Sequence, residues 1–173
     1  YNSLRWYQKV GFNLLWAISW LISYSPRFLR YGLYRPFITL VLRVVGYRRR
    51  VILRNLENSF PEKSSKEIKH IMRRYYVTLA EIIVNTISLV GANPKRTGNA
   101  LLCDEADELI KQTKGRDWVV MAAHYGCWEY YPLWCWKDPS TDFLSVYHPL
   151  KSPVFEHFFR RIRSYGDNNI LVT

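Results

Sequence analysis

The chain has 173 residues, of which 49% are hydrophobic and 16% aromatic, and its formal net charge is +11. This length provides one ordinary domain or part of a larger one. The three cysteines, Cys103, Cys127 and Cys135, are odd in number and scattered, which argues against a disulfide framework and against a zinc knuckle.

The excess positive charge lies in the first third of the chain. Residues 1–56 contain ten Lys and Arg and no Asp or Glu, whereas the other residues carry 15 basic and 14 acidic groups. This third is also rich in Leu, Trp, Ile and Phe, which favours an anionic membrane surface over nucleic acid as its partner. We therefore expect residues 1–56 to form a basic, apolar membrane-anchoring or interfacial segment and residues 57–173 to begin an α/β domain.

Two apolar helices are expected within the first segment. Residues 10–26 are uncharged and would form a helix of about 25 Å, just short of a bilayer's hydrocarbon core. Spanning, re-entrant and interfacial placements remain open, as does a core helix of a soluble protein. Residues 36–45 predict an amphipathic or interfacial helix, and the arginines at 48–50 either meet lipid phosphates or form a solvated run.

The helical pattern continues after residue 61. Ser64 and Glu67 form a capping-box pattern at the start of a long amphipathic helix, which is expected to end near Gly91. Residues 104–114 predict a shorter helix that stops at Gly115.

The last third alternates between strand and helix patterns. Strands are predicted over residues 118–123, 143–147 and 170–172, with helices over residues 129–136 and 153–163 between them. This order predicts an α/β fold with a mixed, largely parallel sheet flanked by helices. Because the chain ends within its last predicted strand, we expect the C-terminal part of this domain to be missing.

The hexapeptide His124-Tyr125-Gly126-Cys127-Trp128-Glu129 directly follows the first of these strands. An imidazole titrates near neutral pH, and a nearby carboxylate can orient it and stabilise its protonated form. The glycine allows the backbone to turn and to approach a substrate closely. The pattern favours a general-base site, with an ordinary buried histidine and a helix N-terminal acid as the alternatives.

Two other chemistries are less well supported by the same residues. Cys127 as a nucleophile beside His124 conflicts with the different directions of neighbouring loop positions. A zinc site of His124, Cys127 and Cys135 lacks the usual ligand spacing. We therefore expect no metal and no cofactor.

Three segments, in this order, resemble the bacterial lipid A biosynthesis acyltransferases, the late or HtrB-like family of the lysophospholipid acyltransferase superfamily. Residues 124–129 resemble the family's His-x4-Asp/Glu motif, and residues 54–61 (Arg-Asn-Leu-Glu-Asn-Ser-Phe-Pro) are similar to its Asn-Leu…Phe-Pro segment. Residues 146–151 together with 158–163 resemble a second conserved block, with His148 where the family commonly has Arg. The chain corresponds to the first part of a typical member.

The resemblance implies a reaction and a set of residues. A fatty acyl chain would pass from acyl carrier protein, or from CoA, to a hydroxyl of a lipid A precursor at the cytoplasmic face of the bacterial inner membrane. His124 would be the general base and Glu129 its orienting partner. The substrate-binding residues would be Gly126, Trp128, His148, Lys151, Arg160 and Arg161.

Two other functions are compatible with the same sequence features. The first is acylation of another glycolipid or of a glycerophospholipid. The second is a non-catalytic protein of the membrane surface that keeps the fold and binds lipid. A nucleic-acid partner is not expected.

Overall fold

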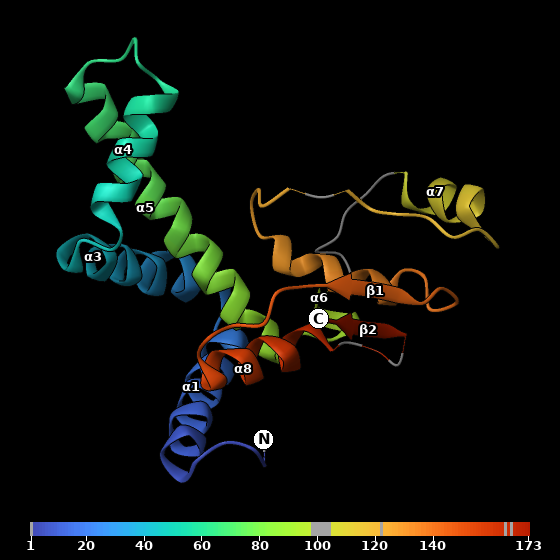
Figure 1. The fold of residues 1–173 in the computed structure, drawn as a ribbon. Coiled ribbons are helices and arrows are strands. Elements are labelled where there is room, and N and C mark those ends of the chain that lie inside the picture. Colours follow the sequence, from blue (N-terminus) through green and yellow to red (C-terminus); the bar gives the residue numbers. More distant parts are fainter. Residues whose placement is uncertain (1, 98–104, 122, 165, 167) are drawn as a thin grey trace. The chain divides into compact units, whose positions relative to one another are not determined.

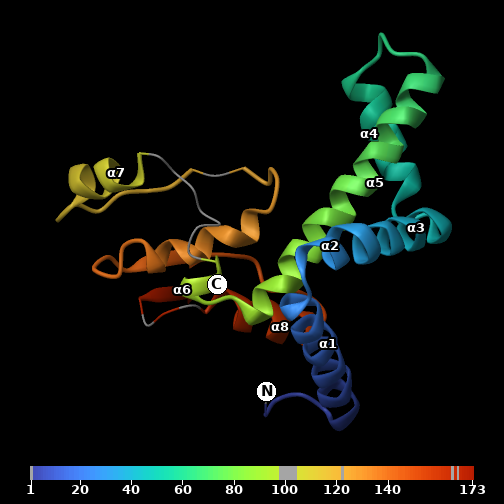
Figure 2. The same cartoon turned by 180° about the vertical axis from the view of Figure 1, so that it is seen from behind.

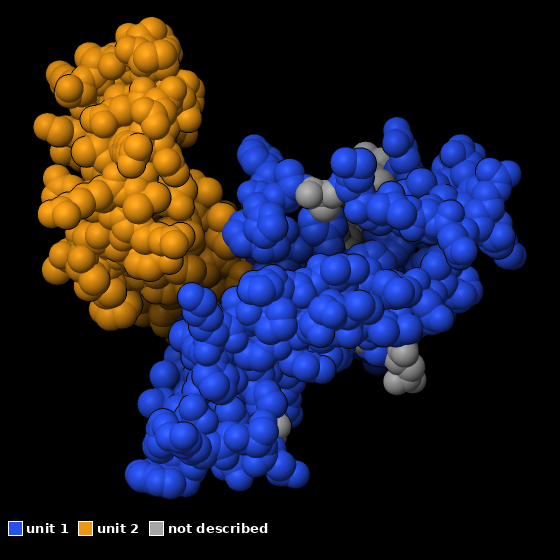
Figure 3. Space-filling view, viewed as in Figure 1, with its two compact units in different colours: residues 1–23, 88–173 blue, residues 24–87 orange. Residues whose placement is uncertain are grey.

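The computed structural model describes residues 2–97, 105–121, 123–164, 166 and 168–173 (Figure 1). Chain contacts divide it into two compact units (Figure 3): unit 1 comprises residues 1–23 and 88–173, and unit 2 comprises residues 24–87. Because these units follow contacts and not composition, the predicted domain division after residue 56 stays a prediction.

Unit 2 is helical. Its elements are α2 (Arg27–Leu29), the π-helix η1 (Arg30–Tyr34), α3 (Arg35–Val45), α4 (Arg49–Ser59) and α5 (Ser65–Ser88) up to Ile87. The two views in Figures 1 and 2 show α4 lying beside α5. The predicted helices over residues 36–45 and from residue 64 onward are both confirmed.

The core of unit 2 follows the helical repeat of α5. Buried apolar side chains recur at every fourth position of this helix: Ile68, Met72, Tyr76, Ala80 and Val84. Ile52 of α4 packs with Met72 and Tyr76, so burial of one apolar stripe holds the two helices together.

A capping box fixes the start of α5. Glu67 accepts hydrogen bonds from the Ser64 N–H at 2.9 Å and from its hydroxyl at 2.7 Å, and these bonds lower the pKa of Glu67. The Ser64 hydroxyl in turn accepts the Glu67 N–H at 3.4 Å, so the predicted capping box is present.

The turn between α3 and α4 is closed by a Schellman motif. Gly46 has φ +66°, its N–H donates to Arg43, and the Tyr47 N–H donates to the Leu42 carbonyl at 3.0 Å. The Tyr76 hydroxyl of α5 donates to the Tyr47 carbonyl at 3.0 Å. Arg48 follows with φ 48°. The backbone of Gly46, Tyr47 and Arg48 is therefore held in one conformation.

Unit 1 combines helices with a small sheet. Its elements are α1 (Trp6–Tyr24) up to Ser23, η2 (Leu89–Gly91), α6 (Pro94–Thr97), α7 (Ala106–Thr113), the 3₁₀ helix η4 (Trp128–Trp136), β1 (Phe143–Val146), α8 (Pro153–Arg163) and β2 (Asn169–Val172). β1 and β2 are parallel, with Phe143 opposite Asn169 and Val146 opposite Val172. Since α8 connects them, the predicted β–α–β order and parallel pairing are confirmed.

The prediction of a strand over residues 118–123 is wrong for the residues that the structure describes. Residues 118–121 and 123 form no strand, and residue 122 lies outside the described residues. A strand needs a hydrogen-bonded neighbour, and within the described residues β1 pairs with β2 only. Val119 and Met121 are 88% and 95% exposed, so this apolar run lacks the burial that its composition suggested.

The helix predicted over residues 10–26 is present as α1, which packs on α8. The ring of Phe12 lies 6.2 Å from His157, and that of Trp16 lies 5.9 Å from Phe158. Arg161 places its guanidinium 4.2 Å from the Trp16 ring, a cation–π contact on the same side of α1. Among the described residues, no helix has both the length and the apolar character needed to cross a membrane.

We expect Phe158→Ala to lower the free energy of unfolding by about 3–5 kcal/mol, because this ring is only 2% exposed and its loss leaves a cavity between α8 and α1. Urea denaturation measures the change. Phe155→Ala on the same helix is the control: that ring is 50% exposed, and its removal is expected to cost about 1 kcal/mol or less. Equal costs for the two variants would contradict the packing described here.

Candidate active site

His124 lies at the surface, before the first turn of η4. Its imidazole is exposed, and its centroid is 4.8 Å from the ring of Trp128. Trp128, the first residue of η4, is half-buried and gives the imidazole one apolar wall. The alternative of an ordinary buried histidine is therefore wrong, and the ring is accessible to a substrate.

Gly126 makes the turn between His124 and Glu129. Its φ is +63°, a left-handed conformation that glycine adopts without steric cost. A Cβ at this position would meet no atom within 4 Å, so the backbone conformation and not crowding requires glycine. The backbone is thus open to solvent at this point.

Glu129 is 5% exposed, and its carboxylate is bound by Arg163 of α8. The Arg163 Nε donates to Oε2 at 2.8 Å and Nη2 donates to Oε1 at 2.6 Å, a bidentate ion pair. Burial by itself lowers the pKa of Arg163, but the hydrogen bonds and charge of Glu129 raise it above the usual value. The Arg163 guanidinium therefore stays charged, and its bidentate contact with Glu129 ties η4 to α8.

The predicted hydrogen bond between His124 and Glu129 is not formed among the described residues. His124 contacts Trp128, whereas both oxygens of Glu129 accept from Arg163. A carboxylate has about four acceptor positions, and the bidentate pair uses two of them. Glu129 therefore keeps the capacity for a further donor.

Arg163 also organises the segment that follows β1. Its guanidinium lies 4.9 Å from the ring centroid of Phe159 and 5.4 Å from that of Tyr147. The Tyr147 hydroxyl donates to Oε1 of Glu156 at 2.7 Å, and the Leu150 N–H donates to Oε2 at 2.8 Å. These contacts fix the loop between β1 and α8 against the helix.

The hydrogen bonds to Glu156 favour the ionised form of its carboxyl group. Partial burial raises the pKa of this carboxyl, but the donors Leu150 and Tyr147, together with the charges of Arg160 and Arg163, lower it overall. Burial and the bond to Glu156 raise the pKa of the Tyr147 phenol. At neutral pH the loop is therefore held by a carboxylate and a neutral phenol.

The other predicted substrate-binding residues lie on and beside this loop. His148 and Lys151 are exposed and have no hydrogen bond or ion pair within the described part of the chain. Arg160 and Arg161 are both exposed on α8, and Arg161 also stacks on Trp16 of α1. All four side chains therefore face solvent, where an anionic group can reach them.

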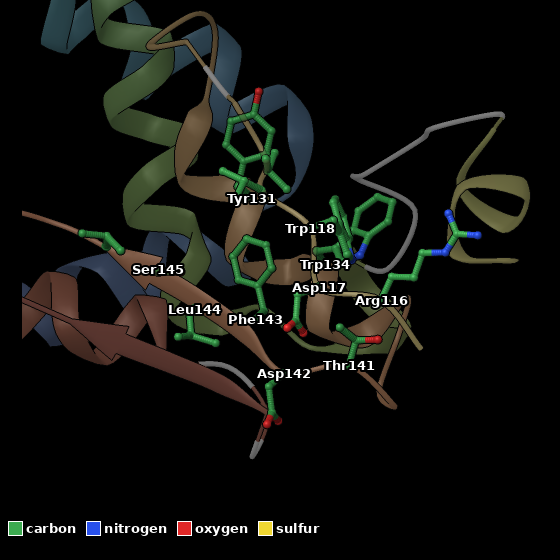
Figure 4. A pocket seen from close by; sticks show the side chains of 13 residues that line it. Arg116, Asp117, Trp118, Tyr131, Trp134, Thr141, Asp142, Phe143, Leu144 and Ser145 are labelled. Carbon is green, nitrogen blue, oxygen red and sulfur yellow. The ribbon is translucent and has the colours of Figure 1, made fainter. Parts of the chain in front are cut away.

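A pocket of about 840 Å³ lies beside β1 (Figure 4). Tyr131, Trp118, Trp134 and Phe143 gather around it, and Trp118 packs edge-on against Trp134 at 6.4 Å between centroids. The indole N–H of Trp134 is buried and has no acceptor among the described residues. Ligand pockets in proteins commonly measure about 300–1,000 Å³ and are mostly apolar. The aromatic wall of this pocket is apolar, while Arg116, Asp117 and Asp142 add charged groups to its lining.

The cysteine alternatives receive no structural support from the described residues. Neither Cys127 nor Cys135 is in a disulfide. Burial raises the pKa of the Cys135 thiol, although backbone hydrogen bonds oppose this, so the thiol is protonated and unreactive at neutral pH. In the described part of the chain, no three His, Cys, Asp or Glu side chains come close enough to hold a metal ion.

The sequence patterns assigned no contact with Glu129 to Arg163 and no role to Tyr147 or Glu156, although Tyr147 and Arg163 lie in the second segment of the resemblance. One signal was available: Glu129 stands among Trp128, Tyr130 and Tyr131, and a carboxylate in an aromatic run needs a cationic partner. The helical repeat of residues 153–163 places Glu156, Phe159 and Arg163 on one face. Choosing Arg163 over its neighbours required the three-dimensional fold.

The family model described as "Bacterial lipid A biosynthesis acyltransferase" matches residues 2–171. The match extends over almost the whole chain and contains all three segments of the resemblance. No curated protein and no solved structure matches the chain significantly.

We expect Arg163→Met to lower the free energy of unfolding by about 3–5 kcal/mol, since it leaves the Glu129 carboxylate buried and unpaired. The double variant Glu129→Gln/Arg163→Met is expected to recover part of this loss, because no charge is then left buried. Urea denaturation of the two single variants and the double variant measures the coupling. Arg160→Met, an exposed neighbour on α8, is the control, and an equal cost there would refute the buried pair.

The stabilisation by Glu156 is expected to depend on pH. Its folded-state pKa lies below the ordinary 4.5, so this contribution is complete above about pH 4.5 and is lost as the pH falls through the folded value. Glu156→Gln should therefore destabilise the protein near neutral pH and converge with the parent in acid. Urea midpoints across this range test it, with the exposed Glu57→Gln as control; a difference independent of pH would contradict the assignment.

Proposed function

The chain belongs to the bacterial lipid A biosynthesis acyltransferase family, and we propose that it transfers a fatty acyl chain from acyl carrier protein to a hydroxyl of a lipid A precursor. The observation that carries the proposal is His124, an exposed imidazole in the family's motif beside a buried ion pair. Acyl carrier protein is preferred over CoA as donor because the basic surface of this protein suits an acidic macromolecule.

His124 is proposed as the general base. Its imidazole accepts the proton of the acceptor hydroxyl as that oxygen attacks the carbonyl carbon of the acyl thioester. The new C–O bond forms, the C–S bond breaks, and the departing thiolate takes the proton from the imidazolium. Such a base contributes roughly 10²–10⁴-fold in rate, and no covalent intermediate on the protein is needed.

Glu129 is proposed to orient His124 and to stabilise its protonated form. Arg163 holds the carboxylate in place and leaves about two of its acceptor positions open. For this role the imidazole turns from its contact with Trp128 toward the carboxylate. Backbone N–H groups around Gly126 are proposed to stabilise the oxyanion that forms on the thioester carbonyl.

The substrates are proposed to approach from two sides. The apolar pocket beside β1 suits the acyl chain of the donor, because Trp118, Trp134 and Phe143 offer it an apolar lining. His148, Lys151 and Arg160 are exposed cations or potential cations that suit phosphate groups of the glycolipid. Arg161 and the face of Trp128 are proposed as further contacts.

The reaction is proposed to take place at the cytoplasmic face of the inner membrane, where a glycolipid acceptor and a soluble acyl donor can meet. The ten basic and zero acidic residues of segment 1–56 support an anionic membrane surface as its partner. We propose that this segment holds the protein there.

Two alternatives lead to different experiments. Another glycolipid or a glycerophospholipid as acceptor would keep the mechanism and change the product. A non-catalytic lipid-binding protein would bind membranes and turn over no thioester.

We expect His124→Ala to lower the rate of acyl transfer by about 10²–10⁴-fold, because the acceptor hydroxyl then lacks a base. The assay measures acylated product from radiolabelled acyl carrier protein thioester and a lipid A precursor. His70→Ala, which changes an exposed histidine on α5, is the control and should retain the parent rate.

Unchanged turnover in His124→Ala would refute the base assignment. An acyl-CoA donor that matches or exceeds the carrier protein thioester would refute the proposed donor. Absence of turnover in the parent protein with every acceptor, combined with vesicle binding, would favour the non-catalytic alternative.

A further inference from the structure

Tyr147 lies where two sets of contacts meet. It directly follows β1, and its N–H donates to the Val172 carbonyl of β2 at 3.0 Å, so the parallel pairing fixes its backbone. Its side chain is half-buried. The hydroxyl donates to Oε1 of Glu156 at 2.7 Å, and the ring centroid lies 5.4 Å from the guanidinium of Arg163. One side chain therefore contacts both the carboxylate that holds the following loop and the cation that holds Glu129.

The hydroxyl belongs to a network that fixes residues 147–152, which we call the cation loop. The second carboxylate oxygen of Glu156 accepts the Leu150 N–H at 2.8 Å. The N–H of Glu156 donates to the Ser152 carbonyl at 2.8 Å, at the start of α8. Together with the bond from Tyr147, these contacts hold the cation loop at its start, in its middle and at its end.

The cation loop presents His148 and Lys151 to solvent on this fixed backbone. A phosphate group that binds these two side chains has little backbone ordering to offset, because the loop is already held in one conformation. When a support is lost, the same two side chains spread over more conformations. The supports of the loop should therefore affect affinity for a phosphate-bearing acceptor and not the chemical step.

The ring of Tyr147 belongs to a second network, which surrounds Arg163. The guanidinium contacts two aromatic rings, Tyr147 at 5.4 Å and Phe159 at 4.9 Å. The Arg163 carbonyl accepts a hydrogen bond from the side-chain amide of Asn169 in β2. With its backbone and its guanidinium both held, Arg163 binds the two carboxylate oxygens of Glu129. Loss of the Tyr147 ring would remove one of the contacts that orient the guanidinium and would loosen the hold on Glu129.

We propose that Tyr147 is a positioning residue with two separable roles. Its hydroxyl acts through Glu156 to fix the cation loop, and so sets the affinity for the phosphate-bearing acceptor. Its ring acts through Arg163 to fix Glu129, and so sets the rate of proton transfer at His124. The inference rests on the proposed function, because it concerns the same acceptor and the same base.

Two substitutions separate these roles. Tyr147→Phe removes the donor to Glu156 and keeps the ring beside Arg163. Tyr147→Leu removes both the donor and the ring. A purely structural role of Tyr147 would instead impair the use of donor and acceptor and the turnover together in each variant.

Steady-state kinetics of the whole chain test both roles. We expect Tyr147→Phe to raise the KM for the lipid A precursor about tenfold and to change kcat and the donor KM less than about threefold, because one hydrogen bond to a charged group is lost away from the reacting atoms. Glu156→Gln should give the same pattern. Tyr147→Leu should raise the acceptor KM as much and also lower kcat about tenfold or more, because Glu129 is then less well held.

Two further measurements do not depend on turnover. Equilibrium binding of the radiolabelled precursor without donor should be about tenfold weaker in Tyr147→Phe, whereas the dephosphorylated precursor should bind the parent and this variant alike. Hydrogen exchange of the Arg163 Nε–H, followed by NMR, should be faster in Tyr147→Leu than in the parent and unchanged in Tyr147→Phe.

Tyr75 provides the matched control, because its side chain is 43% exposed on α5 in unit 2. Tyr75→Phe and Tyr75→Leu make the same chemical changes and should keep the parent values of acceptor affinity, kcat and Arg163 exchange. Glu57→Gln, at an exposed position of α4, is the control for Glu156→Gln. Circular dichroism should give the parent spectrum for each variant.

The two roles can be overturned separately. Parent-like binding of the phosphorylated precursor by Tyr147→Phe would overturn the role of the hydroxyl. Equal kcat values and equal exchange rates of the Arg163 Nε–H in Tyr147→Phe and Tyr147→Leu would overturn the role of the ring. A joint rise of the donor and acceptor KM in Tyr147→Phe would assign this residue to general structure and overturn both roles.

Failure of the proposed function gives a different result. The parent protein would then bind the precursor without turnover, while Tyr147→Phe would bind it more weakly. That outcome would refute acyl transfer and support the role of the hydroxyl at the cation loop.

Discussion

The buried ion pair between Glu129 and Arg163 is the constraint on which the candidate site depends. Both N···O distances are short, and Glu129 is almost fully buried, so the pair joins η4 to α8 with strong directionality. The guanidinium then rests on Tyr147, whose hydroxyl leads to Glu156 and the loop after β1. A single arginine therefore connects the segment of the histidine motif with the segment of exposed cations.

The two titratable residues of the motif lie in different environments. His124 stays at the surface beside Trp128, where a substrate can reach it, while Glu129 is withdrawn into the protein and fixed. A fixed carboxylate suits general-base chemistry because it needs no reorganisation when the imidazole becomes charged. The acyl transfer proposed for this member of the family uses this division between an exposed imidazole and a buried, fixed carboxylate.

The net charge of the protein is distributed unevenly between the two units. Unit 1 contains the motif, the pocket and the loop, and its basic residues nearly balance its acidic ones. Unit 2 carries most of the net charge and an exposed apolar helix face. The candidate site and the excess of positive charge therefore fall on different parts of the chain.

The sequence by itself determined the family, the histidine motif, the capping box at Ser64, the long helix α5 and the β–α–β order around α8, because each depends on local spacing or on ordered motifs. Tertiary structure alone decided that Glu129 pairs with Arg163 and that the apolar run after Trp118 forms no strand in the described residues. Ion pairs and strand ladders join residues far apart in the chain, and local patterns carry no information about which partner is near.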